Sequence, residues 1–539
     1  MTSQRRHFSF LVWSVFSVAV FTAAMCLQQA DFQIVLRTLA LGAGAAAIAV
    51  PCGAMLAWTA SKSGFVPAAV RAFCLVGVLL PVLVYVSAWD AAFGKLGWMS
   101  SASGQVLKPV IGKWQAAIWI HAMIATPQIA ILFWAAIRSG RQRWQDAIQL
   151  DRPPLPAAIL TGWWKFSPFV IAAVLWTVVS CAREIGVTDI YQIGTLAEQV
   201  YLGYSLGQLG SIGTVWTPEQ IQAAQDLGIG VSLLIIAWLA GTATMVFLQA
   251  ASVNAPVQGG QDSISEPSSK LQSIASVILM LILVAVPLVN LIVKVGFTVI
   301  VVDDQPMATW TVGAALQSLS TVVTNFQNEF RWSALIALAS TVLITAVALP
   351  VAWMARNKKW MWWILVIGFS ALVATPGPTI GLGIAKVFAS LDFGWAHYLY
   401  DRTILAPVIA NAIFCLPLAL LMHFFLACQT GTQEHELAVV DGITGWRAFW
   451  HLNVRPRIHS HLICLMLVFA ISFGELSASQ MVLPPGIDSV PRLTLGLLHS
   501  GVSETVAAIT LVGLAPFLLV ALLSWLLAWL GSGSKTNVL

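Results

Sequence analysis

The chain has 539 residues, of which 58% are hydrophobic and only 9% are charged, and its formal net charge is +5. Soluble domains carry about 25% charged residues, so this composition argues against a water-soluble helical bundle. The small positive charge is explained by basic residues in the loops between hydrophobic runs, and it does not indicate a nucleic-acid-binding protein.

Hydrophobic runs of about eighteen residues or more recur along the chain, and each could cross a hydrocarbon core of about 30 Å as a helix. Helices satisfy their own backbone hydrogen bonds, which favours them in lipid. The sequence therefore predicts an all-α polytopic membrane protein with about twelve transmembrane helices. In chain order, the expected spans are residues 8–27, 34–59, 72–90, 114–137, 166–188, 227–249, 273–300, 331–355, 361–388, 404–427, 460–480 and 506–531.

The first hydrophobic run follows Arg5 and Arg6, as the core of a signal peptide would. The run is too long for a typical signal core and TAAMC is a poor cleavage site, so we predict an uncleaved first span. Basic residues concentrate in alternate loops, and such loops face the cytoplasm. With this orientation both termini are cytoplasmic.

A weakly hydrophobic stretch divides the predicted spans into six and six. Residues 251–271, ASVNAPVQGGQDSISEPSSKL, are rich in Gly, Ser, Pro and Gln, as in a flexible linker. The expected organisation is a first six-helix domain at 1–250, a cytoplasmic linker at 251–272 and a second six-helix domain at 273–539.

The two halves resemble each other at a shift of about 290 residues. Each half has an even number of predicted spans, so the halves run in the same sense across the bilayer. This pattern predicts a parallel repeat around an axis along the membrane normal, with a central pathway at its interface. The ordered pairs are Pro51 with Pro350, Pro127 with Pro417, and Glu184 with Glu475.

Prolines and two matched polar residues add detail to the predicted spans. Six prolines are expected to mark kinks or helix boundaries, and PGPTIGLG at 376–383 predicts a locally broken helix. His121 and Asn411 match across the repeat and are expected to make hydrogen bonds between helices. The six prolines are Pro51, Pro81, Pro127, Pro350, Pro376 and Pro417.

A polar segment, residues 428–459, separates the tenth and eleventh spans. Glu436 and Asp441 are expected in the early turns of a short helix, and Gly442 and Gly445 permit a sharp turn. The aromatic residues that follow recur at helical spacing and predict an apolar stripe. They are Trp446, Phe449 and Trp450. Such a stripe indicates a protein docking site, or else a helix that packs on its own bundle or in the lipid interface.

The pattern E-x-A-x3-G-x9-L-x-V in this segment resembles the cytoplasmic EAA loop of ABC importer permeases. The resemblance implies the type I permease fold and a coupling helix that sits in a cleft of an ATPase subunit. Leu437 replaces the first alanine of the family pattern, and Arg455 stands where a proline is expected. The motif positions are Glu436, Ala438, Gly442, Leu452 and Val454.

The first half has a weaker counterpart of this loop at residues 138–168. By its distance from Pro127, Asp146 and Ala147 fall at motif positions, while Arg152 replaces the glycine and prolines follow. Because proline fixes φ and lacks a donor, we expect a shorter or bent coupling helix there. Two unequal loops imply asymmetric contacts with two ATPase subunits.

A second resemblance concerns the transported substrate. FGELSASQMVLPPG at 473–486 and the stretch 183–205 resemble ferric-iron permeases, and the likeness covers essentially the whole chain as a fused two-half permease. It implies a bacterial inner membrane, two cytoplasmic ABC ATPase subunits and a periplasmic or lipid-anchored substrate-binding protein. Permeases for thiamine, sulfate, polyamines and phosphonates share the architecture and stay as alternatives.

Glu184 and Glu475 are predicted near the outer ends of the fifth and eleventh spans, with Ser477 in the same pathway segment. Ionisable groups at membrane depth tend to face a cavity or a partner, and oxygen donors suit a hard cation. These carboxylates would handle Fe³⁺ transiently or form an electrostatic gate. Alternatively, Glu184 pairs with Arg183 and Glu475 caps a re-entrant helix. We expect no stable metal site and no cofactor.

The chain has no GxxxxGK[ST] loop, so energy must come from a partner or a gradient, and the chain is expected to be a transport subunit without enzymatic activity. A gradient-driven secondary transporter is the main rival, with Asp90 as its candidate carboxylate. A membrane enzyme is the other rival, but the clustered histidines match no metal-binding spacing. They are His435, His451, His459 and His461.

Overall fold

The computed structural model describes most of the chain, in ten stretches. These are residues 29–102, 109–151, 155–207, 217–223, 228, 230, 268–302, 305–357, 359–391 and 393–533. Several predictions lie outside the described residues: the span at 8–27, the span at 227–249 except residues 228 and 230, the linker up to residue 267, and the placement of both termini.

The described residues form helices and one β-hairpin. The elements up to residue 230 are α2 (Gln29–Ala60), α3 (Phe65–Leu79), α4 (Val82–Phe93), α5 (Trp98–Ala102), α6 (Lys113–Asp151), α7 (Leu155–Arg183), α8 (Gly186–Ile190) and α9 (Leu196–Ser205). Those that follow are α11 (Lys270–Met280), η1 (Leu281–Ala285), α12 (Val286–Val295), β1 (Phe297–Val302), β2 (Gln305–Trp310), α13 (Val312–Asn325), α14 (Gln327–Asn357), α15 (Lys359–Ala374), α16 (Gly377–Ser390), α17 (Gly394–Arg402), α18 (Leu405–Cys428), α19 (Thr432–Val440), α20 (Gly445–Ala448), η2 (Phe449–Val454), η3 (Arg455–Arg457), α21 (Ile458–Phe473), η4 (Ser479–Met481), α22 (Val490–Leu498), α23 (Glu504–Gly513) and α24 (Ala515–Gly533).

Seven helical segments in the described part are long and apolar enough to cross a membrane, or nine if two bent pairs each count as one span. The chain is therefore an all-helical polytopic membrane protein, apart from the hairpin, and the total of twelve spans stays a prediction. The seven segments are Gln33–Ala60, Lys113–Ile137, Lys270–Val295, Gln327–Arg356, Leu405–Cys428, Gly445–Phe473 and Glu504–Ser524; a shorter apolar helix is Phe169–Arg183.

Two predicted spans are broken by sharp bends. The angle is 99° between α3 and α4 and 103° between α15 and α16. Pro81 and Pro376 are the residues immediately before α4 and α16, where proline interrupts the preceding helix because it lacks an N–H and disfavours helical geometry one residue earlier. The predicted break at 376–383 is therefore present, and Pro81, expected to mark a kink or helix boundary, stands at the bend within the predicted span 72–90.

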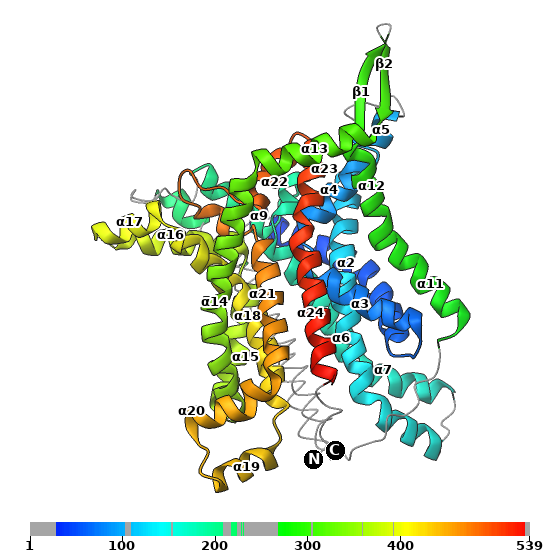
Figure 1. The fold of residues 1–539 in the computed structure, drawn as a ribbon, viewed down its shortest axis with the longest axis vertical. Coiled ribbons are helices and arrows are strands. Elements are labelled where there is room, and N and C mark those ends of the chain that lie inside the picture. Colours follow the sequence, from blue (N-terminus) through cyan, green and yellow to red (C-terminus); the bar gives the residue numbers. More distant parts are fainter. Residues whose placement is uncertain are drawn as a thin grey trace.

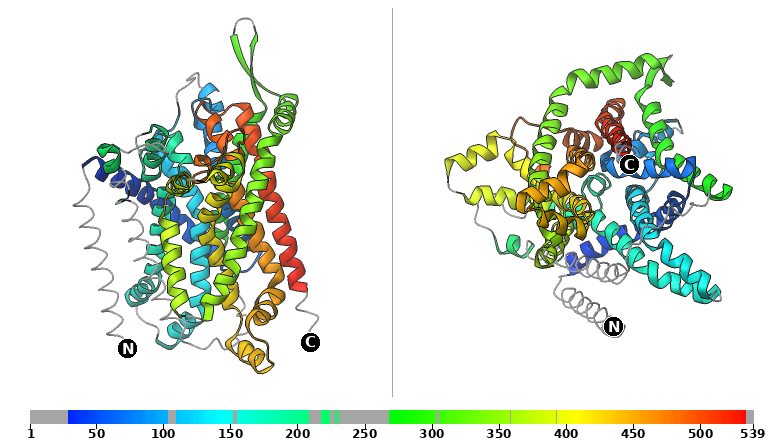
Figure 2. Two further views of the ribbon diagram at one scale, coloured as in Figure 1. Left: turned by 90° about the vertical axis from the view of Figure 1, so that its left-hand side faces the viewer. Right: turned by 60° about the horizontal axis from the view of Figure 1, so that its bottom comes forward.

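A β-hairpin replaces the end of the predicted span at 273–300. Helix α12 ends at Val295, and β1 then pairs with β2 in antiparallel register, with Phe297 opposite Trp310. The run FTVIVV is rich in β-branched residues, which favour a pleated strand over a helix. The hairpin extends away from the helices at one end of the molecule (Figure 1, Figure 2).

Two groups of helices make similar contacts. In one, α2 packs along α6 and α7; in the other, α14 packs along α18 and α21. Small residues on α2 permit the close approach: a Cβ at Gly42 would lie 2.6 Å from the Val178 backbone, and one at Gly53 would lie 3.1 Å from the Thr126 carbonyl. Helices α11 and α12 pack against α2, α3 and α4, so the seventh predicted span contacts the first half.

The two segments that resemble coupling loops lie at the same end of the bundle, opposite the hairpin (Figure 1). Helices α19 and α20 and the junction of α6 with α7 define this end, which we call the loop end. The hairpin and α13 define the other, the hairpin end. The core between them is built mainly from alanine, leucine, isoleucine and valine side chains.

Candidate coupling loop and pathway

The segment between α18 and α21, which we call the coupling loop, is a helix–turn–helix. It begins with α19, turns at residues 441–444 and continues through α20, η2 and η3. Helix α19 starts at Thr432, where the Gly431 N–H donates to Glu434 Oε2 at 3.3 Å. Glu436 therefore lies in the middle of α19 and Asp441 follows its last residue, so the predicted placement of both in early turns is wrong.

Glycine makes the turn possible. Gly442 and Gly445 have φ values of 75° and 58°, in the left-handed region that L side chains rarely adopt. The Ile443 N–H donates to the Ala438 carbonyl at 2.7 Å, and the Gly442 N–H donates to the Val439 carbonyl at 3.0 Å. These bonds satisfy carbonyls at the end of α19 as in a Schellman motif. The sharp turn predicted at the glycines is present.

One face of the coupling loop is mounted on the bundle. Ala438, Phe449 and Val454 are buried, and the last two form an apolar cluster with Trp353 of α14 and Ala427 of α18. Leu452 packs against this cluster. The ring centroids of Trp353 and Phe449 are 6.0 Å apart, in an edge-to-face arrangement. Phe449 thus points inward and does not belong to an exposed stripe.

The other face is apolar and exposed. Leu437 is 65% exposed, Val440 83%, Trp446 70% and Trp450 47%. We call these four residues the apolar docking surface. Glu436 is exposed beside them. An apolar surface rimmed by polar residues is typical of a binding site on a protein or of a helix at the lipid interface.

Arg457 joins the two ends of the coupling loop. Its guanidinium donates to the Leu452 carbonyl at 2.7 Å, to Thr430 Oγ1 at 3.1 Å and to the Gln429 carbonyl at 3.0 Å. Pro456, which follows Arg455 at the position departing from the family pattern, lies in the first turn of η3. The neighbouring π-helical and 3-10 turns accommodate a residue without an N–H inside the helical stretch Gly445–Phe473, so the departure does not end the helix.

The first-half segment is built differently. Helix α6 continues without interruption through Asp146 and Ala147 to Asp151, and α7 begins at Leu155. Within the described residues no separate short helix occupies the motif positions, so the expectation of a short or bent coupling helix does not describe this segment. Pro156 lies in the first turn of α7, where its missing N–H is tolerated.

Glu184 follows the last residue of α7 directly, and Glu475 follows α21 after one residue, Gly474. Glu184 accepts hydrogen bonds from the Gly186 and Val187 N–H groups, the latter at 3.0 Å. Glu475 accepts from the Ala478 N–H at 2.6 Å and the Ser479 N–H at 3.1 Å. Each carboxylate therefore caps the short turn that follows it, and the capping role considered for Glu475 applies to both residues.

The two capped turns meet. The Ile185 N–H donates to Ser477 Oγ at 3.4 Å, and Ser477 also packs against Gly377, where a Cβ would lie 2.3 Å from the Ser477 Cβ. Arg183 reaches the second half as well: its guanidinium donates to the Phe414 carbonyl at 3.2 Å and lies 4.0 Å from the centre of the Phe414 ring.

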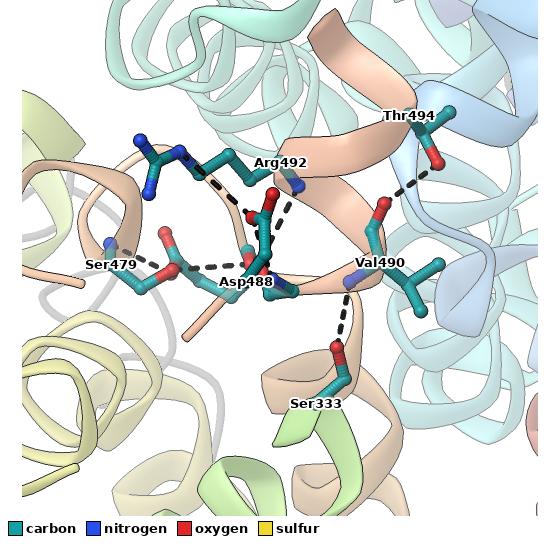
Figure 3. A network of polar contacts seen from close by, with 8 residues as sticks. Ser333, Ser479, Asp488, Val490, Arg492 and Thr494 are labelled. Atoms are coloured by element: carbon teal, nitrogen blue, oxygen red, sulfur yellow. Dashed lines mark hydrogen bonds and ion pairs between the residues drawn. The ribbon is translucent and has the colours of Figure 1, made fainter. Parts of the chain in front are cut away.

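The chain after Glu475 is held by further polar contacts (Figure 3). The Ser479 hydroxyl donates to the Glu475 carbonyl at 3.4 Å, and the Val490 N–H donates to Ser333 Oγ of α14 at 2.8 Å. Arg492 Nε lies 3.9 Å from Asp488 Oδ1. The first contact holds the turn of η4, and the second fixes the start of α22 against α14.

Acidic residues follow the capped turn of the first half. Asp189 Oδ2 lies 3.3 Å from His499 Nε2, which links α8 to the second half. Burial raises the pKa of Asp189, and the neighbouring His499 opposes this shift. Burial, together with the negative charge of Asp189, raises the pKa of Glu198 to about 7, while Gln199 and Arg37 act in the opposite direction.

No metal site emerges from the part of the chain that the structure describes: no group of three or more His, Cys, Asp or Glu residues could hold an ion there. Both carboxylates at the contact between the halves are engaged by backbone N–H groups. The geometry therefore supplies no ready set of oxygen ligands around Glu184 and Glu475.

Comparison with known proteins connects the chain to membrane transport. No family model matches it. It is 26% identical over 179 residues to the "Putative molybdenum transport system permease protein YvgM" of Bacillus subtilis (strain 168), a match that covers 31% of this chain and 77% of that protein. The relative is described as a transport permease, in agreement with the polytopic helical architecture.

Proposed function

We propose that the chain is the transmembrane permease subunit of an ATP-driven ABC importer and forms its translocation pathway. The coupling loop carries this proposal. Its apolar docking surface projects from the loop end, while Phe449, Val454 and Arg457 hold the loop to the spans. A helix mounted in this way transmits the motion of a docked partner to the bundle as a rigid body.

The pathway in this proposal lies between two parallel six-helix repeats, residues 1–250 and 273–539, joined by the linker at 251–272. Three features support the repeat: the bends of 99° and 103° before Pro81 and Pro376, the paired caps at Glu184 and Glu475, and the matched packing of α2 and α14. Glu184, Glu475 and Ser477 would line a constriction where the two capped turns meet.

The partners follow from this assignment. Two cytoplasmic ABC ATPase subunits would bind the loop end and hydrolyse ATP, one at the coupling loop and one at the junction that contains Asp146 and Ala147. A periplasmic or lipid-anchored binding protein would deliver cargo at the hairpin end. The loop end then faces the cytoplasm of a bacterial cell, and the spans lie in its inner membrane.

Two cargoes are favoured by different observations. The Glu-Leu-Ser segment at 475–477 resembles ferric-iron permeases and favours iron(III). The similarity to a permease described for molybdenum favours an oxyanion. Because both carboxylates at the constriction already accept backbone hydrogen bonds, selection between cargoes would rest mainly with the binding protein. Thiamine, polyamine, sulfate and phosphonate importers share the architecture and define the remaining range.

Reconstitution into liposomes tests the function. The chain is combined with its ATPase and binding protein, and uptake of radiolabelled iron(III) or molybdate is measured with ATP and, separately, with an ion gradient. ATP-driven uptake that requires all three proteins is expected. Uptake driven by a gradient without the ATPase would establish the secondary-transporter alternative and overturn the proposal.

A further inference from the structure

Three buried polar groups connect the coupling loop to the two spans beside it. They are His423 of α18, His461 of α21 and Asn453 of η2. The Nδ1 atoms of the two histidines lie 3.1 Å apart, and their rings stack with centroids 5.3 Å apart. His461 Nε2 lies 3.3 Å from the Asn453 carbonyl oxygen.

These contacts fix the positions of the protons if both rings are neutral, the form that burial favours. A carbonyl oxygen only accepts, so His461 Nε2 carries a proton and His461 Nδ1 is then an acceptor. His423 Nδ1 must therefore donate to it. His423 Nε2 is left as a buried lone pair with no partner among the described residues. The result is a directed chain of hydrogen bonds from α18 through α21 to the loop backbone.

This chain complements the contacts of Arg457. Arg457 joins the end of α18 to Leu452, whereas the histidines reach the next residue of η2, Asn453, from inside the bundle. Apolar side chains could fill the same space without burying nitrogen atoms that need hydrogen-bond partners. Burying such an atom costs free energy when its hydrogen bond is missing. Two interactions at adjacent residues of η2 oppose sliding or rotation of the loop relative to α18 and α21.

We propose that His423 and His461 are positioning residues that pass the displacement of the coupling loop to α18 and α21. This inference rests on the proposed function. In this inference the histidine pair couples ATP hydrolysis to opening of the pathway. The apolar docking surface binds the ATPase. Loss of the pair should leave hydrolysis intact and reduce the cargo moved for each ATP hydrolysed.

The test uses the complete reconstituted complex and compares His461→Phe with His461→Gln. Phenylalanine fills the space but makes no hydrogen bond, so transport per ATP should fall by at least about fivefold while ATPase binding is retained. Glutamine keeps an N–H donor for the Asn453 carbonyl and should recover most of the wild-type ratio. His397→Phe, an exposed histidine on α17, is the matched control and should leave the ratio unchanged.

Each result has a defined meaning. An unchanged ratio in His461→Phe, or a glutamine variant as uncoupled as the phenylalanine variant, overturns the inference. If His461→Phe fails to assemble, His423→Phe takes its place under the same criterion. Absence of ATP-driven uptake by the wild-type complex would instead refute the proposed function, so the two failures are distinguishable.

Discussion

The coupling loop and the α6–α7 junction occupy the same end of the molecule but differ in construction. In the coupling loop, Gly442 and Gly445 reverse the chain, and buried aromatic contacts hold it to α14 and α18. At the junction, α6 continues through the motif positions, and Arg152 replaces the glycine. Two segments at matching positions of the predicted repeat therefore need not form the same mechanical element, because the reversal depends on residues that accept positive φ.

The largest loss of affinity for the ATPase should come from changes in the apolar docking surface, which the structure describes only in the coupling loop. Trp446→Ala combined with Trp450→Ala removes two exposed aromatic anchors of the kind that dominate interfaces, so affinity for the ATPase should fall by at least about thirtyfold. Titration of the ATPase against purified permease measures this. Trp395→Ala, an exposed tryptophan on α17, is the control and should have no effect.

Unchanged affinity in the double variant would instead place the two tryptophans in the lipid interface. The comparison between the two regions would then lose its functional meaning, because the coupling loop would not present a surface for a partner. Quenching of the loop's tryptophan fluorescence by brominated lipids would identify that outcome directly.

The turn itself provides the next prediction. Gly442→Val forces a β-branched residue into left-handed geometry, which costs about 1–2 kcal/mol of free energy. A Cβ at this position meets open space, so the strain lies purely in the backbone. Ala147→Val places the same side chain within a continuous helix, where its propensity costs only about 0.6 kcal/mol. Affinity for the ATPase should fall by up to about tenfold in the first variant and little in the second.

Gly442→Asn is the conservative control, since asparagine tolerates left-handed geometry better than other non-glycine residues. It should retain most of the wild-type affinity. Equal losses from Gly442→Val and Ala147→Val would contradict the claim that only one of the two regions depends on a folded turn.

Local sequence pattern predicted the features that depend on composition and backbone chemistry. The apolar runs predicted most of the described spans, Pro376 predicted a helix break, and the paired glycines predicted the turn. The strand at 297–302 was missed because a β-branched apolar run next to a span has the same hydropathy as the span itself.

Contacts between distant residues could not be predicted in the same way. Spacing predicts Phe449 in an apolar stripe that either docks a partner or packs on the bundle, and only the fold shows that Phe449 packs inward, against Trp353 of α14. Arg457 and the pair His423–His461 join elements more than twenty residues apart in sequence. Charge and spacing reveal such residues as polar positions, but only the folded arrangement of α18, η2 and α21 shows which groups they meet.

The comparison extends to the stretches after the capped turns, where each half carries an acidic residue in a different setting. Glu198 of the first half is buried near Asp189, whereas Asp488 of the second half lies beside Arg492. Since the pKa of Glu198 is raised to about 7, the folded chain binds this proton more tightly than the unfolded chain. The resulting stability is complete below the ordinary pKa of glutamate and is lost as pH rises through about 7.

Thermal unfolding between pH 6 and pH 8 measures this difference. Wild-type stability should fall by on the order of 1 kcal/mol across this window, and Glu198→Gln should remove that part of the slope. Because groups that do not interact with Glu198 contribute equally to both proteins, the comparison isolates Glu198 together with its interaction with Asp189. Identical slopes would show that its burial does not control its protonation.

The smallest expected effect tests the symmetry of the two caps. Glu184→Gln and Glu475→Gln each leave one oxygen acceptor for two backbone N–H donors, so each should lower stability by about 1 kcal/mol, and the two losses should be similar. If charge at the constriction also acts on cargo, the double variant should transport more slowly at full assembly. Unaltered uptake would leave both carboxylates as structural caps, and clearly unequal losses of stability would break the proposed equivalence of the two halves.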